Sequence, residues 1–456
     1  MKRKLLSLAA LLLTVGAAAQ NLHSGYFTDG YTYRHEMNPA FGADGNGYVA
    51  IPALGNINVR TQGNFGLGDV MFDNPSYPAT SDSKKTTFMN SQIPVSEALS
   101  GFNKGENRIL GDVKLALLSV GFRGMGGFNT IDVNVRGSLA FSLPYELFEF
   151  AKNAGNGVYD IGNISEQAMA FTEIALGHSH KIDDQWRVGG KVKAYLGVMR
   201  MKMEMEDMKA GRGETGSWTM SGSTTMEVQA KGFSYDTDDK DYVDGYTYKS
   251  PGISGFGLGL DIGAEYRITP DLAVSAALLD LGFISWSKNK TARNKGSFEF
   301  NGFHNATAEN DDGLLIDDEW ESYRDQLEDF VHLTPDAEEG SSVSSGVGTT
   351  VNVGVEYTLP MYRALKFGLL GTSRLQSKYG WTEARLSANY APLSWLDGGV
   401  NFAVGTFGTS MGWLLNIHPV GFNFFVGMDH IIGHTYKYCI PTSSNANVAL
   451  GFNVTW

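Results

Sequence analysis

The stretch Val448-Ala-Leu450-Gly-Phe452-Asn-Val454-Thr-Trp456 ends the sequence on an aromatic residue. Every second residue in it is large and apolar, and the residues between are small or polar. Because successive side chains of a β-strand point to opposite faces, this pattern predicts one apolar and one polar face. A strand with lipid on one side and a polar lumen on the other has this composition. The stretch therefore predicts a membrane-spanning β-strand.

The other end of the sequence has the pattern of a secretory signal peptide. Lys2, Arg3 and Lys4 precede an apolar run over 5–15, and small residues at 17–19 provide a cleavage site. This run is too short to cross a bilayer as a helix. We expect residues 1–19 to be removed, and no cysteine at position 20 is available for lipid attachment. A secreted chain with such a final strand is expected in the outer membrane of a Gram-negative cell.

The same alternation recurs along the chain, notably over 186–198, 256–268 and 351–359. In the second of these we expect Leu260 and Ile262 to face lipid, and Asp261 and Glu265 to face inward. Charges on one face of so many strands require water or partners, which a polar lumen supplies. The pattern predicts an all-β transmembrane antiparallel barrel.

The spacing of the alternating segments predicts how they are connected. Long connections, above all 201–253 and 286–348, alternate with short ones such as 269–271, and the tally is fourteen strands over residues 47–456. In bacterial barrels the long loops are extracellular and the short turns periplasmic, which places both termini in the periplasm. Residues 20–46 precede the first strand without its alternation, and we expect them to form a plug inside the barrel.

Composition and motif searches exclude several function classes. Without the three signal cations, 33 basic residues face 49 acidic ones, a net charge of −16 that argues against nucleic acid as a partner. A single cysteine, Cys439, cannot form an intrachain disulfide. We find no nucleophile elbow, zinc-protease motif or phosphate-binding loop, so we expect neither an enzyme nor a cofactor. The histidine pairs 178/180 and 430/434 do not complete a metal site, and no metal is expected.

Several motifs resemble one known group of outer-membrane barrels. Asn38-Pro39-Ala40 is similar to the Asn-Pro-Ala hatch element of FadL-type transporters, which are fourteen-stranded barrels with an N-terminal hatch. The segments 48–56, 143–148, 257–266 and 279–286 resemble a Bacteroidota branch of that superfamily, of unassigned function and related to a barrel of type IX secretion. The terminal residues Phe452, Val454 and Trp456 resemble the signal read by the barrel assembly machinery. That machinery and outer-membrane lipid are the expected partners.

One row of residues suggests where a ligand binds. Beyond the strand 186–198, Met199, Met201, Met203 and Met205 have the same sequence parity as Tyr195, which is the expected lumen side. Methionine is flexible and polarizable and suits irregular apolar ligands. We therefore list these five residues as a candidate ligand-binding surface. The alternatives are that the methionines pack under the 201–253 loop, or that a bulge resets the register.

Two functions remain open. The FadL resemblance implies that the barrel binds or transports small hydrophobic compounds across the outer membrane. The competing function is a non-transporting barrel that docks secretion or surface-assembly proteins. A continuous apolar path through the lumen favours the first, and charged inward rows favour the second.

Overall fold

The structure is a computed structural model, and the residues it describes are 21–42, 47–79, 83–153, 157–213, 216–300, 309–310, 313–314, 316–431, 435–436, 440–441 and 443–456. The expected signal peptide, residues 1–19, lies outside them. None of the helices in these ranges is both long and apolar enough to cross a membrane.

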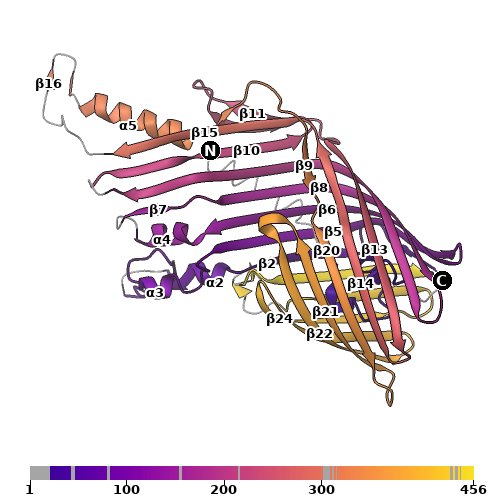
Figure 1. Ribbon diagram of the computed structural model, residues 1–456. Helices are drawn as coiled ribbons and strands as arrows, with labels where there is room; N and C mark the ends of the chain where they lie inside the picture. Colours follow the sequence, from indigo (N-terminus) through magenta and orange to yellow (C-terminus); the bar gives the residue numbers. More distant parts are fainter. Residues whose placement is uncertain are drawn as a thin grey trace.

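Fourteen antiparallel strands close into a barrel, as the sequence predicted (Figure 1). The first strand is split into β1 (Gly47–Ala50) and β2 (Ile57–Gly63), and both pieces pair with the last strand, which closes the ring. The others follow in chain order: β5 (Glu106–Gly124), β6 (Gly127–Pro144), β8 (Ile164–Lys181), β9 (Trp186–Arg212), β13 (Gly255–Thr269), β14 (Leu272–Trp286), β20 (Thr349–Thr358), β21 (Leu365–Leu375), β22 (Trp381–Leu393), β23 (Leu396–Gly405), β24 (Gly408–Ile417), β25 (Phe422–Met428) and β28 (Ala446–Thr455).

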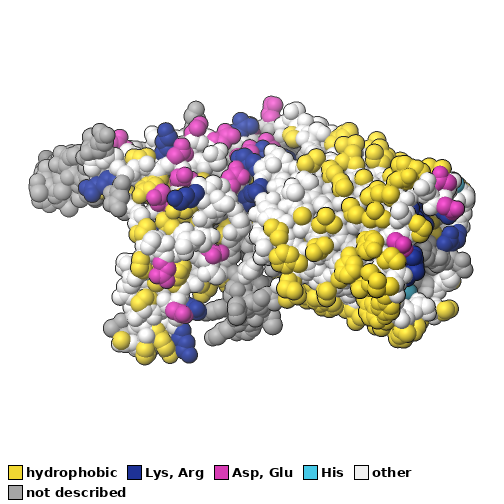
Figure 2. Space-filling view, turned by 60° about the horizontal axis from the view of Figure 1, so that its bottom comes forward, with side chains coloured by type: hydrophobic (Ala, Val, Ile, Leu, Met, Phe, Trp, Pro, Cys, Tyr) yellow, Lys and Arg dark blue, Asp and Glu magenta, His cyan; other side chains and the backbone are white. Residues whose placement is uncertain are grey.

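The outer surface of the barrel is apolar, and Figure 2 shows hydrophobic side chains gathered over it. Leu260 and Ile262 are exposed on this surface while Asp261 is buried, so the face assignment made from the sequence is confirmed. At the end of the barrel where the short turns lie, exposed aromatic residues form a rim: Trp186, Tyr357, Tyr362, Tyr390, Trp395 and Trp456. Aromatic residues at the edge of an apolar band mark a membrane interface.

One side of the barrel wall continues far past the apolar band. β5, β6, β8 and β9 are 18 to 27 residues long, and β9 passes from β13 to a new neighbour, β10 (Trp218–Ala230). β15 (Asn289–Phe300) pairs with β10 and widens this projecting sheet (Figure 1). Much of 201–253, expected as a loop, therefore forms strands, because its alternation and its pairing partners continue beyond the membrane.

The long connections between barrel strands contain smaller helices and strands. The hairpin of β11 (Phe233–Thr237) and β12 (Val243–Tyr248) covers the outer face of the projecting sheet. The others are the helices α2 (Leu67–Val70), α3 (Val95–Ala98), α4 (Tyr145–Asn153) and α5 (Ile316–Val331), the turn η3 (Ser377–Tyr379), and the short strands β3 (Met71–Asp73), β4 (Lys85–Thr87), β7 (Val158–Asp160), β16 (Glu309–Asn310), β17 (Gly313–Leu314), β18 (Thr334–Pro335), β19 (Val343–Gly346), β26 (Thr435–Tyr436) and β27 (Ile440–Pro441).

Candidate functional site: a plugged lumen

Residues 21–42 lie inside the barrel. They form two short turns, η1 (His23–Gly25) and η2 (Thr32–Glu36), and we call this segment the plug. Its apolar residues pack against wall residues of β21 to β28 in one buried cluster: Leu22, Tyr26, Phe27, Tyr31, Tyr33, Met37 and Phe41 with Leu370, Leu414, Phe425 and Ala449. Wall side chains alone fill an eight-stranded barrel, whereas fourteen strands leave a wider lumen, which the plug occupies here.

The start of the plug is held by a carboxylate from the wall. The backbone N–H groups of His23 and Ser24 donate to the two oxygens of Asp429, at 2.9 and 2.7 Å. The Ser24 hydroxyl also donates to Asp429, at 2.7 Å, and accepts from the side-chain amide of Asn401, at 2.9 Å. Charge-assisted bonds of this kind are stronger than neutral ones, so the contact fixes where the plug enters the lumen.

The motif Asn38-Pro39-Ala40 docks on the opposite wall. The Asn38 side chain is buried, and its amide donates to the Ala264 carbonyl at 3.2 Å. Two glycines that face each other across β9 and β13, Gly189 and Gly263, make this approach possible. A Cβ at Gly263 would lie 2.1 Å from Asn38 Oδ1, and one at Gly189 would lie 2.1 Å from the Pro39 carbonyl oxygen. A side chain at Gly189 would therefore collide with the plug backbone, whereas one at Gly263 would collide first with the end of the Asn38 side chain.

Beside the plug, five charged side chains of β6, β8, β9, β13 and β14 form a buried ion-pair layer: Arg136, Glu173, Lys193, Asp261 and Asp280. Arg136 donates to both oxygens of Asp280, at 3.0 and 2.9 Å, and to Glu173 at 2.7 Å. Lys193 Nζ lies 2.8 Å from Asp261 and 2.6 Å from Asp280. A bulge in β14 brings Asp280 into this layer, where its backbone N–H donates to Asp261 at 2.7 Å. Bulges re-aim side chains in this way.

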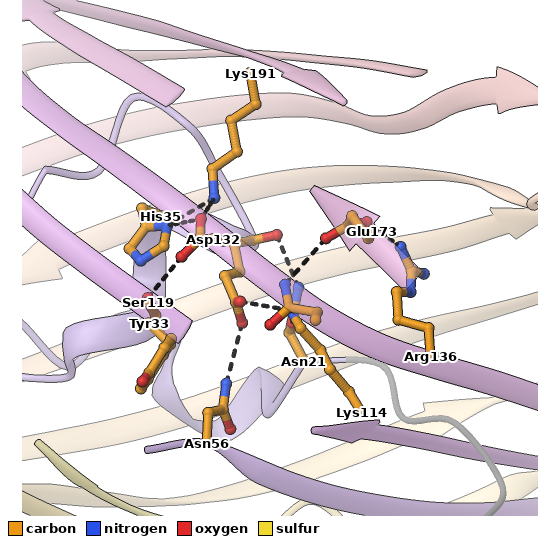
Figure 3. Close-up of polar contacts among 12 residues, drawn as sticks. Asn21, Tyr33, His35, Asn56, Lys114, Ser119, Asp132, Arg136, Glu173 and Lys191 are labelled. Atoms are coloured by element: carbon orange, nitrogen blue, oxygen red, sulfur yellow. Dashed lines mark hydrogen bonds and ion pairs between the residues drawn. The ribbon is translucent and has the colours of Figure 1, made fainter. Parts of the chain in front are cut away.

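Two further groups tie the plug to the charged wall (Figure 3). Lys114 Nζ lies 2.5 Å from Glu36 and donates to Asn21 at 3.1 Å. In the second group, Lys191 donates to His35 Nδ1 at 2.8 Å and to Asp132 at 3.1 Å.

The position of His35 makes it a neutral link between plug and wall. Burial, together with the positive charge of Lys191 beside it, lowers the pKa of His35 to about 3, against the opposing effect of Asp132. A neutral ring that accepts from Lys191 at Nδ1 must carry its proton on Nε2. Nε2 therefore donates to the Tyr48 hydroxyl, 2.7 Å away, and Tyr48 in turn lies 2.9 Å from Ser119.

The space left between the plug and this wall is small. A cavity of about 30 Å³ lies among Glu36, Lys114, Arg136, Asp280 and Arg374. Such a volume holds roughly two water molecules. This cavity is too small for an organic molecule, and most of the described residues that line it are charged.

Comparisons with known proteins place the chain in a family. A family of unknown function (DUF5723) matches residues 39–429. The chain belongs to this family. No curated protein matches it. Solved structures that it is similar to include the Ralstonia pickettii toluene transporter TbuX, with 10% identity over 92% of this chain and 93% of that one, at a TM-score of 0.40.

Two more likenesses are of the same order. The Pseudomonas putida toluene transporter TodX shares 9% identity over 96% of this chain and 93% of that one, at a TM-score of 0.41. A Pseudomonas aeruginosa FadL homologue shares 9% over 97% and 95%, at 0.37. These are likenesses of overall shape, and the fourteen-stranded barrel of this chain rests on its own strand pairings.

The methionine row does not face the lumen, so the parity drawn from the sequence is wrong. Gly197 pairs with Phe171 and Met199 with Ala170, which leaves Val198 as an extra residue in β9. This bulge reverses the parity: Tyr195 points inward, whereas Met201 is buried on the outer face under the β11–β12 hairpin. Met199 packs there too, and Met203 faces Met226 of the same cluster. Met205 follows two residues later on that face.

Other residues singled out from the sequence lie at the ends of strands. Phe452 stacks on Phe422, with ring centroids 5.6 Å apart, while Val454 and Trp456 are exposed on the outer surface. His178 contacts Asn129, and His430 is buried inside the barrel, whereas position 434 lies outside the described residues. Over the described ranges, no group of three or more His, Cys, Asp or Glu side chains could hold a metal.

Sequence reasoning missed most partners of the ion-pair layer. Asp261 was assigned to the inner face, but Arg136, Glu173 and Asp280 were not identified. Their strands also alternate, as in Asp132-Val-Asn134-Val-Arg136, which is a readable sign of an inward polar row. The register between neighbouring strands decides which of these charges form pairs, and the sequence alone does not reveal that register.

Proposed function

We propose that this chain is an outer-membrane barrel that binds and passes small hydrophobic compounds, and that displacement of the plug opens the path. The observation that carries the proposal is that the ion-pair layer lies wholly on the wall. Arg136, Lys193 and their three acidic partners belong to five wall strands, so displacing the plug leaves these charges paired and separates only plug–wall pairs such as Lys114–Glu36. Charges left unpaired in a buried site would cost several kcal/mol, roughly 3–5.

The side of the plug that faces away from the ion-pair layer supports hydrophobic compounds as the ligand class. There the plug covers the apolar wall residues Leu370, Leu414, Phe425 and Ala449. Once the plug is displaced, these residues line one side of an opened lumen. A small apolar molecule gains by contact with such a surface, at roughly 25 cal/mol per Å² buried.

A reversible lock tests the proposal. In a chain without its native cysteine (Cys439→Ala), the pair Asn38→Cys and Gly263→Cys joins plug and wall. We expect uptake of the apolar fluorophore N-phenyl-1-naphthylamine through the outer membrane of intact cells that carry the barrel to fall when the pair is oxidised and to return on reduction. Asn38→Cys alone is the control, with uptake insensitive to oxidation. Equal uptake in the oxidised and reduced states would refute plug displacement.

We further propose that the short-turn end faces the periplasm, so that the projecting sheet lies outside the cell. An epitope tag at Asp238 should then be labelled on intact cells, whereas a tag beside Pro270 should require permeabilised cells. The proposed role of the terminal aromatic in assembly has its own test. Trp456→Ala should reduce the folded, heat-modifiable band in outer-membrane fractions.

The projecting sheet favours a second candidate function, docking of a protein partner. Its inner face carries polar and charged side chains, among them Arg200, which lies 3.3 Å from Glu227 and donates to Gln229 at 2.7 Å. A strand that only crosses the membrane needs roughly 9–11 residues, whereas β9 has 27. Arg200→Ala together with Glu227→Ala should abolish crosslinking to such a partner while uptake of the fluorophore stays unchanged. Loss of uptake alone would favour the first function.

A further inference from the structure

A second cavity, of about 480 Å³, opens at the short-turn end of the barrel beside the plug. Its walls come from plug residues 29–32, from the turns 391–397 and 418–421, and from the end of β28. Ligand pockets for small molecules are typically about 300–1,000 Å³. This cavity is therefore of ligand size, unlike the small one in the middle of the lumen.

One side of the pocket is apolar. Tyr31, Leu393, Pro419, Val420 and Trp456 line it, and Val420, Leu393 and Trp456 lie at its mouth, because their side chains are also exposed on the surface. Burying such exposed apolar surface against a ligand is favourable, at roughly 25 cal/mol per Å². This side suits a compact ring system.

The other side is polar and acidic. Asp397 is buried; its carboxylate accepts from the Gly30 N–H at 2.9 Å and from Asn416 at 2.7 Å. His418 Nε2 lies 3.4 Å from the same carboxylate. Asp29 also lines the pocket, but Arg34 at 2.6 Å and Lys366 at 2.5 Å already pair with its carboxylate, so Asp397 supplies the negative charge. The lining, as far as the structure describes it, contains neither lysine nor arginine. Opposite charges attract and like charges repel, so this side favours a cationic head over an anionic one.

We propose that this pocket binds small aromatic amines, with the ring on the Trp456 side and the ammonium group at Asp397. This site rests on the proposed function in one respect: the amine reaches the pocket as a compound that passes through the barrel. Binding to the purified barrel does not require passage, so the two can fail separately.

The first experiment needs no variant. The intact barrel in lipid nanodiscs is titrated with three probes that share one ring system: 1-naphthylmethylamine, 1-naphthylmethanol and 1-naphthoate. We expect affinity to fall in that order, with the amine binding about tenfold more tightly than the carboxylate, the order of one hydrogen bond to a charged group. Equal affinities, or no binding of the amine, would overturn the proposal.

The second experiment locates the site. Ser394→Trp fills the pocket from an exposed turn and should abolish amine binding, and Asp397→Asn should reduce amine affinity about tenfold towards that of the alcohol. Met361→Trp places the same bulk on a turn outside the pocket, and binding should be unchanged. Amine binding that survives Ser394→Trp in a folded barrel would place the site elsewhere and overturn the assignment.

The outcomes separate this inference from the proposed function. If the amine binds at the pocket but uptake does not respond to the Asn38–Gly263 lock, the proposed function is refuted and the amine site is supported. Uptake that stops when the Asn38–Gly263 pair is oxidised, together with equal affinities for the three probes, would support the proposed function and remove the amine site.

Discussion

The two halves of β9, on either side of the bulge at Val198, reach the same arrangement by opposite sequence parity. In the barrel half, odd-numbered Lys191 and Lys193 point inward and Val192 outward. In the projecting half, even-numbered Arg200 points inward and Met201 outward. The extra residue keeps apolar side chains on the outer face where β9 exchanges β13 for β10.

What differs between the halves is what covers the outer face. Val192 is 59% exposed on the barrel surface, where the proposed environment is lipid. Met201 is only 4% exposed, because the β11–β12 hairpin covers it. Four substitutions along this one strand test the comparison, and each is measured as the shift in urea unfolding of the barrel in lipid vesicles.

Lys193→Ala should have the largest effect. Its ammonium group lies within 3.5 Å of three buried carboxylates, Glu173, Asp261 and Asp280. Removing one partner of a buried pair costs about 3–5 kcal/mol, because the remaining charges stay desolvated. The double variant with Asp261→Asn should recover part of the loss. A loss below 1 kcal/mol for the single variant would mean that water reaches this layer.

Val192→Arg tests the outer face of the barrel half. An arginine on the lipid face near the bilayer midplane costs about 2–4 kcal/mol. Val192→Leu, which keeps the surface apolar, is the matched control and should change little. If both variants unfold alike, this face does not meet lipid.

Met201→Ser tests the outer face of the projecting half. Loss of a buried apolar side chain costs about 2 kcal/mol, and here the loss should loosen the hairpin without affecting uptake of a hydrophobic probe. Proteolysis within 231–252 is the second readout and should become faster. If the variant folds normally but loses probe uptake, the prediction from the sequence that the methionine row binds the ligand would be supported.

Lys202→Ala should have the smallest effect. Lys202 lies 2.6 Å from Glu204, but about a third of each side chain is exposed. Exposed ion pairs contribute about 0–1 kcal/mol. The contrast with Lys193→Ala is the sharpest form of the comparison, since both lysines face inward on one strand. Equal losses would show that the projecting half is as dry as the barrel half.

Much of the fold could be predicted because alternation is a local property. The faces of Leu260 and Asp261 followed from period two alone, and the strand count followed from the spacing of alternating segments. The methionine row was misassigned at one point, where Val198 and Met199 are adjacent apolar residues. That break in the alternation was the available sign of a bulge, but a local break does not say whether the chain bulges or turns.

By itself the sequence determined the class of the protein: a chain of alternating strands with a signal-like start, two faces per strand, and an N-terminal segment without alternation. These follow from which residues tolerate lipid and which do not, and that is decided residue by residue. Only the tertiary structure decided which charges meet, that Asp280 enters the ion-pair layer through a bulge, and that a pocket of ligand size lies at the foot of the plug. Pairing and cavities depend on the register between strands that lie far apart in the sequence. A shift of one residue reverses which side chains face inward, and local composition does not encode the register.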